Sequence, residues 1–100
     1  MKILALEVEA PNLSAADFQP HLEAEARCAW QLHQSGVIRE LYFRADQHTA
    51  VLVLECASVE EAQQALANLP LVQAGLIHFE LIPLAAYPGF ARLFATKAAQ

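Results

Sequence analysis

The sequence lacks the residues on which several common kinds of site are built. It contains only three glycines, and they form no loop that could cradle a phosphate. The two cysteines, Cys28 and Cys56, are far apart and belong to no CxxC pair, so neither a disulfide framework nor a structural zinc site is expected. No GxSxG segment is present, which leaves covalent serine catalysis without support. We therefore expect no cofactor and no metal ion.

Basic side chains are also scarce. Six lysines and arginines stand against eleven aspartates and glutamates, for a net charge of −5 with neutral histidines. This is the wrong sign for a surface that neutralises phosphates, so neither nucleic acid nor an anionic membrane is an expected partner. No apolar run approaches the roughly 20 residues that cross a bilayer. Glu7 and Glu9 stand where a secretory signal would be apolar, and the expected location is the cytoplasm.

What the sequence does contain is a high proportion of apolar residues in periodic segments. Hydrophobic residues make up 56% and charged residues 17% of 100 residues, enough for the single core of one small domain. Alternation over residues 2–9 predicts a strand. Ser14 and Asp17 predict the start of a helix that runs to about Ser35, with Gly36 as its stop. Two β-rich runs, a second helix opened by a capping box and a last strand follow at residues 37–45, 49–56, 58–69 and 76–84.

The order of these elements predicts the fold class. It is α+β, a ferredoxin-like βαββαβ pattern with a four-stranded antiparallel sheet and both helices on one face. Residues 50–54 are apolar on both faces of their strand, so the face without helices also needs a cover, and a second copy of the chain is the simplest one. We expect a homodimer or larger homo-oligomer.

The C-terminal segment adds to that expectation. Tyr87-Pro88-Gly89 predicts a turn, and Phe90, Leu93 and Phe94 form an apolar stripe with no intramolecular face left to meet. We therefore predict a domain over residues 1–86 and a tail over residues 87–100 that packs on a neighbouring subunit.

A single carboxylate interrupts the apolar side of the first predicted helix. Glu25 lies in a stripe whose other members are apolar: Phe18, Leu22, Ala29 and Leu32. A carboxylate aimed at a core or cavity loses water, which raises its pKa and suits a general base that takes and returns a proton. Equally, Glu25 is a buried residue paired with an arginine or bonded to a backbone amide.

Cationic and aromatic side chains near the second predicted strand are candidates for substrate binding. Arg39 and Arg44 flank Tyr42, and a guanidinium could hold a substrate carboxylate with two hydrogen bonds. Residues five apart face opposite sides of a regular strand, so both line one pocket only if a bulge intervenes. The alternative for each is an edge-strand charge that discourages aggregation. His33 flanks the apolar stripe and either lines the cavity of Glu25 or is a packed histidine.

The sequence resembles the muconolactone isomerases and their relatives, which are small dimeric α/β-barrel proteins. The resemblance covers most of the chain and rests on the order and separation of four segments: Gly36-Val37-Ile38-Arg39, Ser58-Val59-Glu60, Leu69-Pro70-Leu71 and Tyr87-Pro88. It implies a ferredoxin-like protomer whose open sheet face meets that of a partner. It also implies a cofactor-free proton shift that moves a double bond in an unsaturated lactone carrying a carboxylate.

The resemblance assigns roles to two residues of this chain. The helix glutamate credited with proton transfer in that family lies eleven residues before the glycine that opens the second strand, and here that position is Glu25. The strand arginine corresponds to Arg39, where it would hold the substrate carboxylate. The isomerases tend to carry a tryptophan just before that arginine, whereas this chain has Ile38.

Three hypotheses about function follow. The first is an isomerase-like protein in which Glu25 moves a proton on a small anionic unsaturated lactone. The second keeps the barrel and changes the reaction to that of a cofactor-free oxygenase, cyclase or dehalogenase, because a fold does not fix a function. The third is a small-molecule-binding or oligomerisation module without chemistry, in which a fixed cationic partner neutralises Glu25 and no cavity opens beside it.

Overall fold

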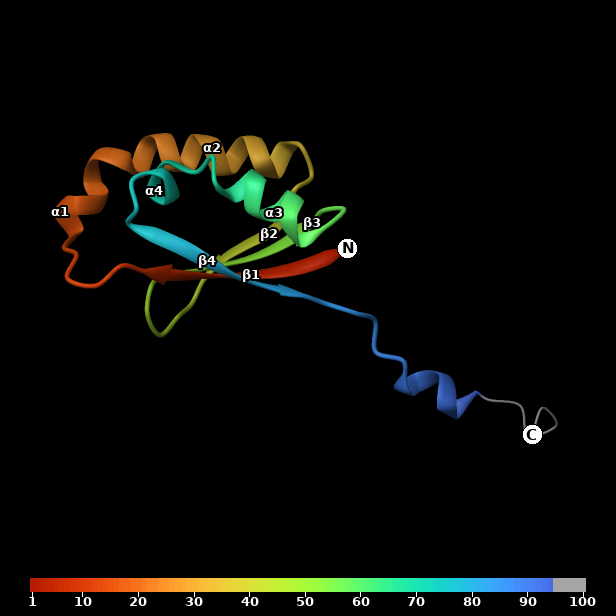
Figure 1. The fold of residues 1–100 in the computed structure, drawn as a ribbon. Coiled ribbons are helices and arrows are strands. Elements are labelled where there is room, and N and C mark those ends of the chain that lie inside the picture. The colour runs from red at the N-terminus through yellow and green to blue at the C-terminus, as the bar shows by residue number, and fades with distance from the viewer. Residues whose placement is uncertain (95–100) are drawn as a thin grey trace.

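A computed structural model describes residues 1–94 and confirms the predicted fold class. A four-stranded antiparallel sheet carries helices on one face and is bare of helices on the other (Figure 1). Its strands are β1 (Lys2–Glu9), β2 (Ile38–Phe43), β3 (Ala50–Glu55) and β4 (Ile77–Pro83). The helical elements are α1 (Ala15–Phe18), η1 (Gln19–His21), α2 (Leu22–Gln34), α3 (Val59–Leu66), α4 (Pro70–Gln73) and η2 (Gly89–Leu93).

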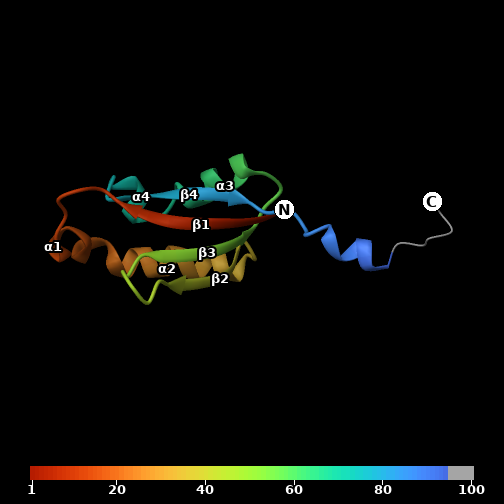
Figure 2. The same ribbon diagram turned by 90° about the horizontal axis from the view of Figure 1, so that it is seen from below.

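The strand order places the first strand in the interior of the sheet. The order is β2-β3-β1-β4, so β1 forms backbone hydrogen bonds with a neighbour on each side (Figure 2). Leu6 of β1 lies opposite Val51 of β3 and Glu80 of β4. Because successive side chains point to opposite faces, this register sends Ile3, Ala5 and Glu7 toward the helices.

The hydrophobic core lies between the sheet and α3. Ile3, Ala5 and Leu54 of the sheet are fully buried, and so is Ala62 of α3. Ile38, Leu66 and Leu69 belong to the same cluster and have almost no exposed surface. Burial of such aliphatic side chains contributes about 1.5–3 kcal/mol each, so this part of the molecule supplies much of its stability.

The prediction of one continuous helix over residues 14–35 was wrong in one respect, because the observed helix is broken near Pro20. A 3-10 turn, η1, separates α1 from α2. Proline has no N–H to donate to the preceding turn, and its ring disfavours a continuous helix. The predicted stop is confirmed: Gly36 follows α2 with φ of +87°, a left-handed conformation that glycine adopts without a steric penalty.

The second predicted helix begins as expected and ends early. The Ser58 hydroxyl accepts the Glu61 N–H at 3.1 Å, as the capping box predicted. The helix α3 stops at Leu66, and the short α4 starts at Pro70, which the sequence had indicated only as a helix end. Proline is well suited to the first position of a helix, and this turn carries Leu71 back over the sheet.

The face of the sheet opposite the helices is apolar and has no cover among residues 1–94. It looks toward the viewer in Figure 2. Partly buried aliphatic residues occupy its centre: Leu4, Leu6, Val51, Val53 and Ile82. Charged residues of the same face lie next to them, Lys2 and Glu55 at one end and Glu80 beside Leu6, as on an interface with a polar rim.

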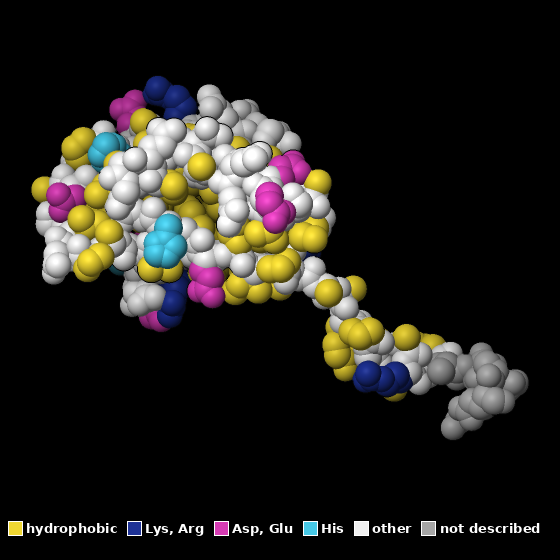
Figure 3. Space-filling model, viewed as in Figure 1, with side chains coloured by type: hydrophobic (Ala, Val, Ile, Leu, Met, Phe, Trp, Pro, Cys, Tyr) yellow, Lys and Arg dark blue, Asp and Glu magenta, His cyan; other side chains and the backbone are white. Residues whose placement is uncertain are grey.

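The chain leaves the body of the fold after β4. It runs away from the sheet to η2, where hydrophobic side chains dominate the surface in Figure 3. Phe90 and Leu93 are 67% and 75% exposed, and Phe94 is 81% exposed. The remainder of the predicted tail, residues 95–100, lies outside the described residues. Within residues 1–94, every helix is too short or too polar to span a bilayer.

Candidate functional site

A cavity of about 270 Å³ opens between α2 and the sheet. Its walls are predominantly apolar and come from both layers. The helix supplies small or aliphatic side chains, and the facing strands supply larger ones, among them Leu22, Ala26, Ala29, Ile38, Leu41 and Phe43. Two side chains that line it carry ionisable groups, Glu7 and Glu25. A carboxylate among such walls is partly removed from water, which is how proteins shift carboxyl pKa values for acid–base work.

Glu25 reaches the cavity from α2. Its Oε1 accepts the backbone N–H of Leu71 at 2.9 Å, one of the free donors in the first turn of α4. Burial raises the pKa of the Glu25 carboxyl above its usual value, and the Leu71 N–H and the His21 charge partly offset this rise. No salt bridge involves Glu25 among the described residues. The backbone bond therefore fixes one carboxylate oxygen without neutralising the charge.

Glu7 is a second carboxylate of the same cavity, and it was not among the predicted site residues. It extends from β1, and its Oε1 accepts the Ala50 N–H at 3.1 Å. Burial raises the pKa of the Glu7 carboxyl most, the Ala50 bond lowers it, and the charges of Glu9 and Glu25 raise it further. Its alternation with Ile3 and Ala5 on β1 was a signal that could have revealed its inward direction.

The predicted arginines do not line this cavity. A register shift between Ile38 and Glu40 places Arg39 at a bulge of β2, where its Nε donates to the Gly36 carbonyl at 2.8 Å. Arg44 lies beyond the end of β2 and forms two hydrogen bonds with the Asp46 carboxylate, at 2.9 and 2.6 Å. The bulge that the sequence required is present, yet it does not bring the two guanidinium groups together.

Tyr42 and His33 also lie away from the cavity wall. Tyr42 is paired with Val51 on the bare face of the sheet, and its hydroxyl donates to Glu40 at 2.7 Å. The Nδ1 of His33 lies 2.9 Å from the Ile38 carbonyl oxygen, and its ring is 5.7 Å from that of Trp30. Of the five predicted site residues, the structure thus places Glu25 alone in the cavity.

A second hollow forms the mouth of the cavity. It measures about 280 Å³ and shares Glu7, Leu22, Phe43 and Leu71 with the cavity wall. At this outer end, additional polar groups come from Gln19, Glu9 and His48. The two hollows together thus combine a polar outer end with an apolar interior that holds two carboxylates.

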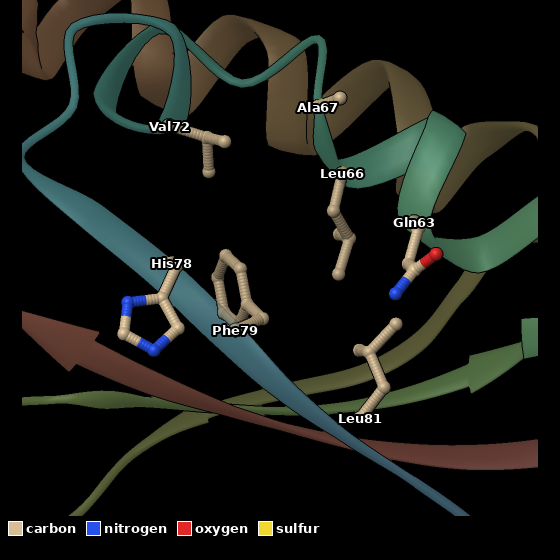
Figure 4. A pocket seen from close by; sticks show the side chains of 7 residues that line it. All are labelled: Gln63, Leu66, Ala67, Val72, His78, Phe79 and Leu81. Atoms are coloured by element: carbon tan, nitrogen blue, oxygen red, sulfur yellow. The ribbon is translucent and has the colours of Figure 1, made fainter. Parts of the chain in front are cut away.

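A further pocket lies between α3, α4 and β4. It is smaller, about 120 Å³, and Figure 4 shows Leu66, Val72 and Leu81 around it. Gln63 and His78 are its only polar side chains, and it contains no carboxylate. No group of three or more metal-ligating side chains occurs within residues 1–94. The Glu7–Glu25 cavity is accordingly the candidate functional site.

Comparisons with known proteins identify a family through one family model and find the same fold in two solved structures. A family model described as muconolactone delta-isomerase matches residues 3–89. A crystal structure of muconolactone isomerase superimposes with a TM-score of 0.72, at 23% identity, over 88% of this chain and 92% of that chain. The 5-chloro-2-hydroxyhydroquinone dehydrochlorinase of Burkholderia phenoliruptrix AC1100, in complex with 2,5-dihydroxybenzoquinone, has a TM-score of 0.61 at 17% identity, over 89% and 98%. No curated protein sequence matches the chain.

Proposed function

Because the chain belongs to the muconolactone delta-isomerase family, we propose that it is a cofactor-independent isomerase that moves a proton on a small unsaturated lactone. The single observation that carries this proposal is the position of Glu25. Its carboxylate lies in an apolar cavity, held by a backbone N–H and without a cationic partner among the described residues. A non-catalytic module with a neutralised Glu25 and no cavity is less consistent with this geometry.

The proposed reaction is a proton shift between two carbons. The Glu25 carboxylate removes a proton from the carbon γ to the lactone carbonyl, and the electron pair moves through the double bond to the carbonyl oxygen. The resulting dienolate takes the proton back from Glu25 at the α-carbon, which leaves the double bond one position along the ring. Proton transfer by one positioned side chain typically contributes about 10²–10⁴-fold in rate.

The surroundings of Glu25 suit this reaction. The Leu71 N–H fixes Oε1, so Oε2 is the oxygen that can exchange a proton with a ligand. The apolar walls from α2 and β2 exclude water from the intermediate. The expected binding of an anionic substrate by Arg39 or Arg44 does not enter the proposal, because neither guanidinium lines the cavity.

The proposal includes a homodimer formed through the bare face of the sheet. Supporting it is the aliphatic patch centred on Leu4, Val51 and Val53, which one protomer leaves partly exposed. Val53→Glu would place a charge in that patch, and we expect sedimentation velocity to show a shift toward monomer. Gln64→Glu, on the exposed side of α3, is the matched control that should leave the assembly unchanged. A monomeric wild-type chain would contradict this part of the proposal.

The decisive test of the catalytic role is Glu25→Gln. Glutamine can still accept the Leu71 N–H, so the fold should persist while the base is lost. We expect kcat/KM on an unsaturated lactone to fall by about 10²–10⁴-fold. Glu23→Gln removes an equal charge from the exposed side of α2 and should retain activity. Full activity in the Glu25→Gln variant would refute the proposal.

A second candidate is a cofactor-free dehydrochlorination, favoured by the structural similarity to the chlorohydroquinone dehydrochlorinase. The elimination starts from the keto tautomer of the substrate, in which a hydroxyl proton has moved to the chlorinated carbon and made it tetrahedral. A carboxylate then removes the proton of a second hydroxyl group, the O–H electrons form a carbonyl as the ring electrons shift, and chloride leaves with the electrons of the C–Cl bond, which gives a hydroxyquinone. Chloride release from a chlorinated hydroquinone, lost in Glu25→Gln, would favour this reaction over isomerisation.

A further inference from the structure

Glu7 gives the cavity a second acidic group at a fixed position. From this we infer that Glu7 is a specificity-determining residue, through which the cavity selects uncharged ligands over otherwise similar ligands that carry a carboxylate. The inference deepens the proposed function, since it concerns the substrate of the same site. It runs against the anionic substrate that the resemblance implied.

Strand pairing and one hydrogen bond hold Glu7 in place. It belongs to β1 and lies opposite Phe79 of β4, one residue beyond the last pair that β1 forms with β3, so strand pairing holds its backbone on one side. Its Oε1 is held by the Ala50 N–H, which leaves Oε2 to face a ligand in the cavity. Glu7 also lines the mouth, so a ligand that enters through it approaches this carboxylate.

No nearby cation compensates for this charge within the cavity wall of the described chain. Its wall includes Glu7 and Glu25 and no lysine, arginine or histidine. At the mouth, one histidine, His48, stands beside a third carboxylate, Glu9. Arg39 donates to a backbone carbonyl, and Arg44 is paired with Asp46. Arg44 lines a separate hollow that also includes Glu7, but it does not line the cavity or its mouth. His21 acts on Glu25 from outside the wall. The wall residues of the described chain therefore contribute a net negative charge to the cavity.

Electrostatics then determine which ligands fit. Like charges a few ångströms apart repel more strongly beside apolar walls than in water, so a ligand carboxylate is disfavoured. An ionised carboxylate can only accept hydrogen bonds, so the favoured ligand presents hydroxyl groups or acidic C–H groups to the two glutamates. Its body would be apolar and about the size of one substituted ring, to suit a cavity of about 270 Å³.

A matched pair of ligands tests the inference. The probes are an unsaturated five-membered lactone with a methyl substituent and the same lactone with a carboxymethyl substituent. Binding of each to the full chain is measured by isothermal titration calorimetry at neutral pH. We expect the wild type to bind the methyl lactone about tenfold more tightly than the carboxymethyl lactone.

Variants assign that preference to Glu7. Glu7→Gln keeps an oxygen for the Ala50 N–H and should reduce the preference to about twofold or less, chiefly by improving binding of the carboxymethyl lactone. Glu7→Asp keeps the charge and should restore the preference. Glu23→Gln makes the same change in net charge at an exposed site of α2 and should leave it intact.

Two outcomes would overturn the inference, independently of any folding defect in a variant. One is a wild-type chain that binds the carboxymethyl lactone as tightly as the methyl lactone or more tightly, or that binds neither. The other is a folded Glu7→Gln variant with an unchanged preference. Because binding is measured, a chain that prefers the methyl lactone without converting it would refute the proposed isomerase activity and leave the role of Glu7 standing.

Discussion

The two halves of the helix-covered sheet face differ sharply, although one strand contributes to both. At one end of β1, Ile3 and Ala5 are fully buried beneath α3. Two residues further along the same face, Glu7 points into a cavity beneath α2. The same sheet face thus supports a packed core at one end and a half-buried acidic site at the other.

Side-chain size on the helices explains this difference. At the packed end, Leu66 of α3 covers the sheet and has almost no exposed surface, whereas the equally buried Leu69 borders the cavity. Above the cavity, α2 presents Ala26 and Ala29, and no residue of α2 is fully buried. Small side chains leave volume between the layers, so the cavity arises from the choice of residues rather than from a different backbone arrangement.

Truncation of a large side chain should have its greatest effect in the packed half. Leu54→Ala removes a fully buried side chain, and we expect a loss of about 2–5 kcal/mol in the free energy of unfolding. Leu22→Ala, at a cavity-lining residue that is 45% exposed, should cost less than about 1.5 kcal/mol. Urea denaturation measures both values. Equal losses would show that the two halves are packed alike.

Replacement of an alanine by a larger residue should also have different effects in the two halves. Ala62→Leu forces a larger side chain into a site with no free surface and should cost about 1–3 kcal/mol. Ala29→Leu extends into open volume, so we expect a smaller loss of stability together with weaker ligand binding. Thermal unfolding and calorimetric titration test the pair. A severe destabilisation by Ala29→Leu would mean that the cavity is not available to side chains.

The cavity carboxylates should make stability depend on pH. Burial raises the pKa of both Glu7 and Glu25 in the folded chain, so the folded state binds protons more readily than the unfolded state. Their stabilising contribution is complete below the unfolded pKa and is lost as pH rises through the raised folded pKa values. Glu9 and His21 also act on these two groups.

Neutral replacements should therefore stabilise the protein near pH 7. For Glu7→Gln we expect a gain of about 1 kcal/mol at most, because solvent screens a half-buried group. The gain should vanish below about pH 4, where the wild-type carboxyls are protonated. Urea denaturation at a series of pH values measures the difference. A Glu7→Gln variant that is less stable than the wild type at pH 7 and equally stable at low pH would contradict this prediction.

The smallest effect is expected outside both halves. Arg27 and Glu23 form an ion pair at 3.1 Å on the exposed side of α2. Such pairs contribute about 0.3–0.5 kcal/mol. Arg27→Ala should therefore change the free energy of unfolding by less than the difference expected between Leu54→Ala and Leu22→Ala. Added salt should reduce even this small change, and a loss above 1 kcal/mol would indicate a contact beyond the ion pair.

The sequence predicted those features that follow from periodicity. Alternation located β1, the spacing of apolar residues identified Glu25, and Gly36 ended the helix as expected. The sequence did not predict features that depend on one residue opposing the local pattern or on tertiary contacts. Pro20 interrupted a helix whose apolar pattern continues across it, and the short α4 has too few residues for a periodic signal.

The candidate site was harder to predict than the fold. Whether Arg44 would reach a pocket depended on Asp46, two residues away, and nothing in the spacing indicated which partner it would choose. The bulge at Arg39 changes which way that side chain points, and bulges have no reliable sequence signal. Glu7 was visible in the alternation of β1, but its role depends on α2, which comes later in the chain.

The hydrogen bond between the Leu71 amide and Glu25 provides an internal reporter. The NMR chemical shift of an amide proton that donates to a carboxylate changes when that carboxylate gains a proton. The Leu71 amide donates to Glu25 at 2.9 Å. The Ala50 amide stands in the same relation to Glu7. Two backbone resonances would thus follow the two ionisations separately in the unmodified, unliganded protein.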